Sequence, residues 1–137
     1  MQNDMCCGGG CGENELPLIG QKIPDLPFEM FHKNGFKKTS LAKFEGKWLV
    51  LFFYPADFTF VCPTELEDLA RHYEKLQALG VEICGVSTDT VFTHKAWFDH
   101  SKAISQVTYP LIADPTSIIS RSFGVYIEEE GLARRGT

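Results

Sequence analysis

The longest uninterrupted apolar stretch of the sequence runs from Trp48 to Tyr54. It is far too short to cross a bilayer as a helix, which needs about 20 apolar residues. Apolar residues without alternation are typical of a strand that is covered on both faces. The stretch therefore predicts a central strand of a sheet, and the rest of the chain has to supply the layers on either side.

A helix is predicted to follow this strand after a short loop. Pro63 near the helix start and Glu65 in its first turn favour a beginning at Cys62. Apolar residues then recur at helical spacing as far as Leu79, and Gly80 is a natural C-terminal stop. The spacing predicts a helix from Cys62 to about Leu79.

Strands and helices continue to alternate along the chain. Residues 81–87 and 109–113 are predicted strands, and residues 90–101 between them form a predicted helix capped by Thr or Asp. A proline-rich edge strand or hairpin is predicted within residues 16–36, packed on the larger sheet. After the third strand, a short helix is predicted to start at residues 114–116 and to end near residues 123–124. A strand over 125–127, a Glu-Glu-Gly turn and a strand at Leu132 follow. This alternation predicts an α/β sandwich with a partly parallel sheet and right-handed crossovers.

The composition is typical of a soluble globular protein with one domain. The 137 residues suffice for one core, with 44% apolar and 23% charged residues. The formal net charge of −5 argues against nucleic acid or an anionic membrane surface as a partner, because both attract basic proteins. Residues 1–15, rich in cysteine and glycine, are predicted to be a flexible tail, and residues 16–137 the folded domain.

The five cysteines indicate free thiols in a reducing compartment. We expect a cytoplasmic location, because the first basic residue is Lys22 and a glycine run stands where an export signal has an apolar core. Cys84 lies in a predicted buried strand, where a thiol usually fills space and only rarely resolves another thiol. Cys6, Cys7 and Cys11 leave three readings open: a thiol that reaches the reactive site, a soft-metal site without Cys-x-x-Cys spacing, or a glycine-rich tail.

Cys62 is the cysteine whose surroundings favour reactivity. A thiol in the first turn of a helix lies near the positive end of the helix dipole and near unpaired N–H groups, which favour the thiolate. Thr59 precedes it by one helical turn, so its hydroxyl is expected on the same side, where both can contact one small substrate. The alternative is a buried thiol that only fills space.

The residues around Cys62 resemble the peroxidatic motif of the peroxiredoxin family. The similar segments are residues 52–55 (FFYP), 58–65 (FTFVCPTE), 85–89 (GVSTD), 94–97 (HKAW), 109–111 (YPL) and 123–125 (FGV). Within the family they are most similar to the typical two-cysteine group of the alkyl hydroperoxide reductase C type, over roughly residues 16–137. The resemblance implies a thioredoxin-like fold with a central mixed sheet flanked by helices, a peroxidase reaction and a cysteine sulfenate intermediate.

The resemblance also assigns roles to five residues. Cys62 would attack the peroxide, Thr59 would hold it through its hydroxyl, and Pro55 would shield the sulfenate. Arg135 would hold Cys62 as a thiolate and stabilise charge on the peroxide oxygens, and Glu65 would orient Arg135 through a bidentate pair. The preceding arginine is the competitor, but successive strand residues point to opposite faces, so only one of the two can face the site.

Two features depart from the typical two-cysteine group. No cysteine follows Cys84, so the resolving cysteine that this group carries near its C-terminus is missing. The last strands and the C-terminal helix of the family are likewise expected to be absent, which leaves part of the sheet unpaired. The chain is then a fragment or a natural truncation, or some other thiol resolves Cys62.

Three functions are compared. The first is a thiol peroxidase in antioxidant defence, which reduces hydrogen peroxide and organic hydroperoxides to water and alcohols. The second, a thioredoxin-like disulfide reductase, is disfavoured because its Cys-x-x-Cys pair would place a cysteine where Glu65 stands. The third is a catalytically impaired chain that acts as a holdase or interaction remnant through an exposed sheet edge.

The resemblance further implies homodimers or rings of dimers, and a disulfide reductase or thioredoxin as electron donor. No cofactor or metal is required, because sulfur itself carries both electrons. The four histidines form no recognisable metal spacing, and most are expected at the surface. His94 and Trp97 are expected to help pack the active-site region.

Overall fold

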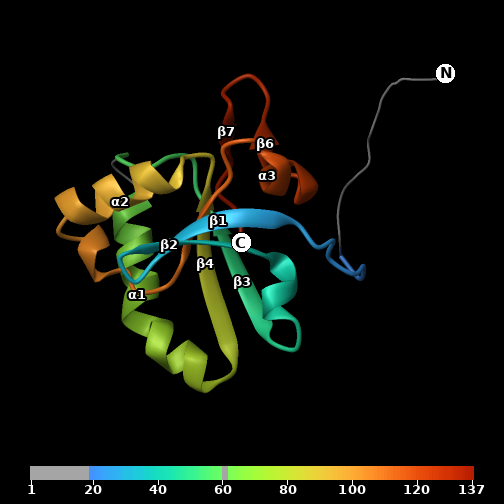
Figure 1. The fold of residues 1–137 in the computed structure, drawn as a ribbon, viewed down its shortest axis with the longest axis horizontal. Helices are drawn as coiled ribbons and strands as arrows, with labels where there is room; N and C mark the ends of the chain where they lie inside the picture. The colour runs from blue at the N-terminus through green and yellow to red at the C-terminus, as the bar shows by residue number, and fades with distance from the viewer. Residues whose placement is uncertain (1–18, 60–61) are drawn as a thin grey trace.

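The computed structural model describes residues 19–59 and 62–137 and shows a sheet with helices on both faces (Figure 1). The tail predicted over residues 1–15 lies outside the described residues. The larger sheet has five strands in the order β2-β1-β5-β4-β3, and a second sheet pairs β6 with β7. The strands are β1 (Pro27–His32), β2 (Gly35–Ser40), β3 (Trp48–Phe53), β4 (Val81–Ser87), β5 (Leu111–Ala113), β6 (Tyr126–Ile127) and β7 (Leu132–Ala133).

The larger sheet is mixed, as expected. β3, β4 and β5 run parallel to one another, whereas β1 runs antiparallel to both β5 and β2. β1 and β2 form a hairpin over residues 27–40, further along the chain than the edge strand or hairpin predicted within residues 16–36. Its turn residues Lys33 and Asn34 both have positive φ angles. Positive φ at both central positions gives a hairpin turn whose twist matches that of the strands. The hairpin thereby adds two strands to the β5 side of the parallel core.

The position of β3 corrects the prediction from the sequence. The stretch is a strand covered on both faces, with Leu51 and Phe53 in one core cluster and Val50 and Phe52 packed against the other. It is not central, because it lies at the end of the five-stranded sheet. On its outer side, Phe53 and Gly136 exchange two backbone hydrogen bonds of 2.7 and 3.2 Å. An apolar run indicates that both faces of a strand are covered, but it does not indicate whether the strand has a hydrogen-bonded neighbour on each edge.

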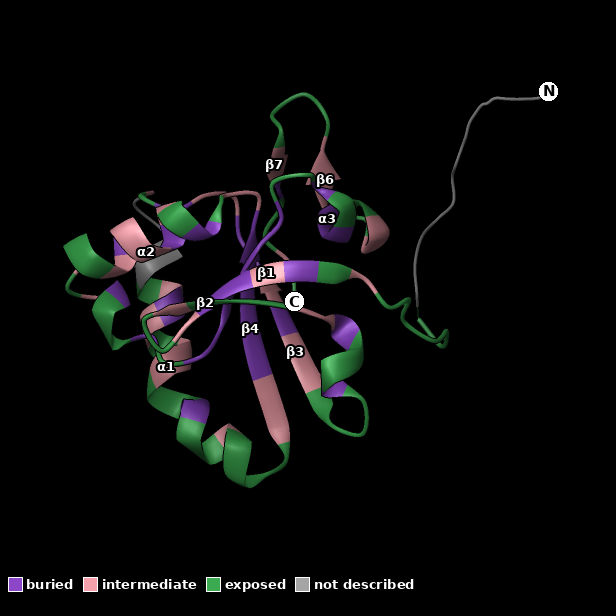
Figure 2. Cartoon of the chain, in the orientation of Figure 1, coloured by how far each residue is buried: buried purple, intermediate pink, exposed green. Residues whose placement is uncertain are grey.

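Two helical layers enclose the sheet. The layer that contains α1 (Cys62–Ala78), α2 (Val91–His100) and the 3₁₀ helix η3 (Ile104–Gln106) buries one core cluster, with Leu66, Trp97 and Ile104 among its members. The opposite layer contains the 3₁₀ helix η2 (Leu41–Phe44) and α3 (Ile118–Ser122) and buries the other cluster. Figure 2 shows buried residues along the strands and exposed residues on the outer sides of the helices. No helix in the described ranges is long and apolar enough to span a membrane.

The predicted helix ends are confirmed to within about a turn. Helix α1 ends at Ala78, and Gly80 beyond it has a φ of 80°. Helix α2 is capped by Thr90, whose hydroxyl accepts from the backbone N–H of Thr93 at 3.3 Å. Helix α3 begins later than predicted, because the Asp114 carboxylate accepts the backbone N–H groups at its start across an intervening turn.

Gly85 marks the tightest packing in the parallel core. A Cβ atom at this position would lie 2.9 Å from Cδ2 of Leu111, with the rings of Tyr54 and Tyr109 at 3.5 and 3.6 Å. Leu111 is fully buried, so it has no open space into which it can move. We expect Gly85→Ala to lower the free energy of unfolding by about 1–3 kcal/mol, as overpacking does in other cores.

Urea denaturation measures this change, with Gly35→Ala as the matched control. A Cβ at Gly35 would meet only the His32 carbonyl, at an ordinary 3.6 Å. The control is expected to stay within about 0.5 kcal/mol of the parent chain. Equal stability of the two variants would contradict the close packing at Gly85.

Candidate active site

The polar residues of the site follow the carboxyl ends of the three parallel strands. The loop from Tyr54 to Thr59 follows β3, Asp89 follows β4, and Asp114 follows β5. The backbone N–H of Asp114 donates to the Ser87 carbonyl at 2.9 Å, which holds two of these ends side by side. Ligands of open α/β sheets gather at such an edge.

The residues predicted around the thiol lie at the start of α1. Cys62 is the first residue of the helix, but its side chain lies outside the described part of the structure. Pro55 and Thr59 are half-buried in the preceding loop. The Thr59 hydroxyl donates to the Ala56 carbonyl at 2.9 Å. Thr59 is not helical, so it does not share a helical turn with Cys62 as expected, and residues 60–61 lie outside the described residues.

Arg135 and Glu65 are brought together across 70 residues of sequence. Nη1 of Arg135 donates to Oε2 of Glu65 at 2.6 Å, with both side chains more than a third exposed. A single hydrogen bond joins them, whereas the resemblance implied a bidentate pair. Arg134 is also exposed, and its backbone N–H donates to Val125. Ion pairs at this exposure add little to stability.

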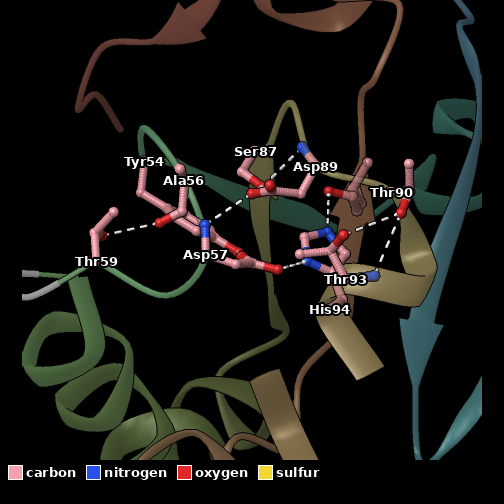
Figure 3. A network of polar contacts seen from close by, with 10 residues as sticks. Tyr54, Ala56, Asp57, Thr59, Ser87, Asp89, Thr90, Thr93 and His94 are labelled. Carbon is pink, nitrogen blue, oxygen red and sulfur yellow. Dashed lines mark hydrogen bonds and ion pairs between the residues drawn. The ribbon is translucent and has the colours of Figure 1, made fainter. Parts of the chain in front are cut away.

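A buried pair of Asp57 and His94 was not predicted. Their carboxylate Oδ2 and ring Nδ1 lie 2.6 Å apart, and neither side chain is exposed. The other carboxylate oxygen accepts from the Tyr54 hydroxyl at 2.7 Å, and the Asp57 backbone N–H donates to Asp89 at 2.8 Å. Figure 3 shows this network running from the loop after β3 to helix α2. The loop that leads to α1 is thereby tied to a different part of the chain.

The pair holds a proton between its two members. Nε2 of His94 lies 3.0 Å from the Ile112 carbonyl, which can only accept, so this nitrogen carries a hydrogen. Burial lowers the pKa of His94, but the hydrogen bond and charge of Asp57 outweigh burial and leave that pKa above 6.5. Burial also raises the pKa of Asp57. Both directions favour one proton retained on the pair, and the raised pKa of His94 favours the ring as its carrier, with His94 as a donor at both ring nitrogens.

The sequence indicated the burial of His94 but not its partner. Val91, His94 and Trp97 recur at helical spacing, and all three are buried on the inner face of α2. As expected, His94 and Trp97 pack against the loop before α1, through Asp57 and Phe58, while His72 and His100 are exposed. Asp57 was missed, although it is a charged residue in an otherwise mostly apolar loop segment.

Cys84 is the other cysteine on which the structure gives evidence. It is fully buried on the sheet face that carries η2 and α3, opposite the layer that contains α1. Burial, together with the charge of Glu82, raises the pKa of the Cys84 thiol to about 12. These surroundings favour an apolar filler over a resolving thiol. Among the side chains that the structure describes, no three of His, Cys, Asp or Glu gather as metal ligands.

The shared proton makes stability depend on pH. Because the pKa of His94 is raised in the folded chain, its contribution is complete below pH 6.5 and is lost as the pH rises through the folded value. We expect the free energy of unfolding to fall above pH 6.5, by at most about 1.4 kcal/mol per pH unit. Tyr54 and Asp89 are the other titratable groups that face the pair.

Urea denaturation of the parent chain and of His94→Gln at several pH values measures this slope. The variant is expected to lose the slope between pH 6.5 and 9, whatever its overall stability. His72→Gln, at an exposed position of α1, is the control and keeps the slope. An unchanged slope in His94→Gln would mean that the proton resides elsewhere.

The chain is similar to known proteins over most of its length. The model of the AhpC/TSA family matches residues 19–137. Alkyl hydroperoxide reductase C from several strains of Staphylococcus aureus is 52% identical over 124 residues, which make up 89% of this chain. Those residues make up 66% of that protein, so the chain spans just under two thirds of the length of these curated relatives.

Solved structures give the same result. The crystal structure of Enterococcus faecalis AhpC superposes with a TM-score of 0.85 at 45% identity, covering 88% of this chain and 72% of that one. Reduced 2-Cys peroxiredoxin from Plasmodium vivax has a TM-score of 0.82 at 32% identity, covering 87% and 76%. The expected thioredoxin-like fold is confirmed, and the chain belongs to the AhpC/TSA family.

Proposed function

We propose that the chain is a thiol-dependent peroxidase with Cys62 as its nucleophile. The Cys62 thiolate attacks the terminal oxygen of a hydroperoxide, so that an S–O bond forms as the O–O bond breaks. Sulfur is oxidised by two electrons to the sulfenate, and the leaving oxygen takes a proton and departs as water or an alcohol. The observation that carries the proposal is the Glu65–Arg135 pair, because Glu65 in the first turn of the helix that begins with Cys62 binds the Arg135 guanidinium.

The roles of the surrounding residues follow from their chemistry. The N-terminus of α1 favours a thiolate at its first residue. Arg135 carries a fixed positive charge that stabilises the developing charge on the leaving oxygen, and Glu65 restrains its guanidinium. In the proposed site, Thr59 orients the peroxide, and Pro55 limits the access of water to the sulfenate.

A second thiol must reduce the sulfenate for turnover. The relatives that resemble this chain are a reductase and a 2-Cys peroxiredoxin by name. We propose that a disulfide reductase or thioredoxin supplies the electrons here, within a reducing compartment such as the cytoplasm. Association into homodimers or rings of dimers is part of the same proposal. The negative net charge of the chain gives nucleic acid and membranes no role in it.

One observation favours a second candidate function, that of a holdase or interaction remnant. An apolar groove of about 560 Å³ runs along β3 and η2, and Leu41, Phe44, Leu49 and Leu51 contribute to its lining. Trp48 at its rim is 78% exposed. Exposed apolar surface of this kind binds other chains. A chain that self-associates and does not react with peroxide would favour this alternative.

Peroxide reactivity is tested by trapping the sulfenate. We expect one equivalent of hydrogen peroxide to label Cys62 selectively, as mapped by mass spectrometry with a sulfenate reagent. Arg135→Ala is expected to slow the labelling by about 100-fold or more, because loss of one preorganised donor costs that much at other sites. The matched control is Arg134→Ala, which removes the adjacent exposed arginine and is expected to change the rate by no more than about twofold. Slow labelling scattered over several cysteines would refute the peroxidase.

The Thr59 hydroxyl is tested by a pair of substitutions. Thr59→Val keeps the shape of the side chain but removes the hydroxyl, and is expected to slow the reaction of Cys62 with hydrogen peroxide by about 10- to 100-fold. Thr59→Ser keeps the hydroxyl and is expected to retain most of the rate. Stopped-flow kinetics over a single turnover measures both. Equal rates for Val and Ser at position 59 would show that the hydroxyl takes no part.

A further inference from the structure

The loop that precedes α1 is fixed by residues that lie outside it. Both oxygens of the Asp57 carboxylate are engaged, one by the Tyr54 hydroxyl and one by His94, at 2.7 and 2.6 Å. Its backbone N–H donates to Asp89 at 2.8 Å, and the same carboxylate oxygen of Asp89 accepts from the Ser87 hydroxyl. Asp57 is therefore held at its side chain and at its backbone, by α2 and by the end of β4.

The residues on either side of Asp57 make contacts of their own, Phe58 with α2 and Ala56 with Thr59. Phe58 has a φ of 62°, a conformation that non-glycine residues rarely adopt without support. Its ring lies 6.1 Å from that of Trp97, which is one helical turn from His94 on α2. The Thr59 hydroxyl donates to the carbonyl of Ala56, the residue before Asp57. The position of this hydroxyl thus depends on where Asp57 is held (Figure 3).

We propose that the buried Asp57–His94 pair is a positioning device for the peroxidase reaction, which holds the loop so that the Thr59 hydroxyl meets the peroxide bound at the start of α1. The inference rests on the proposed function. His94 touches neither the thiol nor the substrate in it and acts only through Asp57. Glu65 and Arg135, in contrast, are half-exposed and belong to the proposed site itself.

Burial makes the pair sensitive to the loss of either member. With both side chains fully buried, removal of one leaves the other without its partner away from water. The loop can relieve that cost by moving, because its own backbone conformation at Phe58 is strained. A displacement of about 1 Å is enough to cost about 100-fold in a reaction that depends on orientation.

The test compares two reagents on Cys62. Hydrogen peroxide needs an oriented hydroxyl, whereas iodoacetamide alkylates an accessible thiolate without one. For Asp57→Ala we expect the rate constant with peroxide to fall by about 10- to 100-fold. The rate constant with iodoacetamide is expected to change by no more than about twofold. Mass spectrometry restricts both measurements to Cys62.

The conservative variant Asp57→Asn separates positioning from charge. An amide can accept from the Tyr54 hydroxyl and donate to Nδ1 of a neutral His94, so the same contacts are possible without the shared proton. We expect this variant to recover the peroxide rate to within about twofold of the parent chain. Lys95→Gln, next to His94 on the exposed side of α2, is the control for substitutions in this region. Should Asp57→Ala not fold by circular dichroism, His94→Gln replaces it, with the same expected loss.

Each outcome decides between the inference and the function on which it rests. A parent chain that does not react with peroxide refutes the peroxidase itself, whatever the variants do. A reactive parent together with an equally reactive Asp57→Ala or His94→Gln overturns the positioning role alone. If the rate constants of the variant with peroxide and with iodoacetamide fall equally, the pair only supports the folded state, and this also overturns the inference.

Discussion

The parallel pairing of β3, β4 and β5 is the constraint on which the site depends. In this pairing Phe52, Gly85 and Leu111 lie side by side, and the space between strands and rings at Gly85 admits no side chain. Because the three strands run in one direction, their carboxyl ends meet at one edge of the sheet. The loop before α1, the polar residues after β4 and Asp114 after β5 are neighbours for this reason.

Local patterns in the sequence predicted most of the elements but little of their arrangement. The turn residues and helical spacing located β4, α1 and α2 to within about a residue, because each depends on neighbouring residues alone. The edge position of β3 could not be predicted, since its outer partner Gly136 belongs to a distant part of the chain. The pairing of Glu65 with Arg135 was inferred from a family resemblance, because no spacing rule links residues so far apart.

The Asp57–His94 pair shows where pattern reasoning ends. Helical spacing places His94 on the inner face of α2, but it cannot reveal which group 37 residues earlier meets the ring. The mostly apolar loop segment around Asp57 is a local hint of burial, but it does not identify the partner of the carboxylate. Only the parallel crossover, which stacks the end of β3 beside the start of α2, brings the two together.

The direction of one hydrogen bond links this architecture to the proposed chemistry. The Thr59 hydroxyl uses its only hydrogen on the Ala56 carbonyl, so the lone pairs of its oxygen remain as acceptors. A hydroperoxide carries an O–H donor, and an acceptor at Thr59 would draw that hydrogen away from the oxygen that sulfur attacks. The guanidinium of Arg135, which is only a donor, is then matched to the oxygen that gains charge as the O–O bond breaks. Fixing Ala56 and Asp57 in the loop thus selects the role of Thr59 as an acceptor, which a freely rotating hydroxyl would not keep.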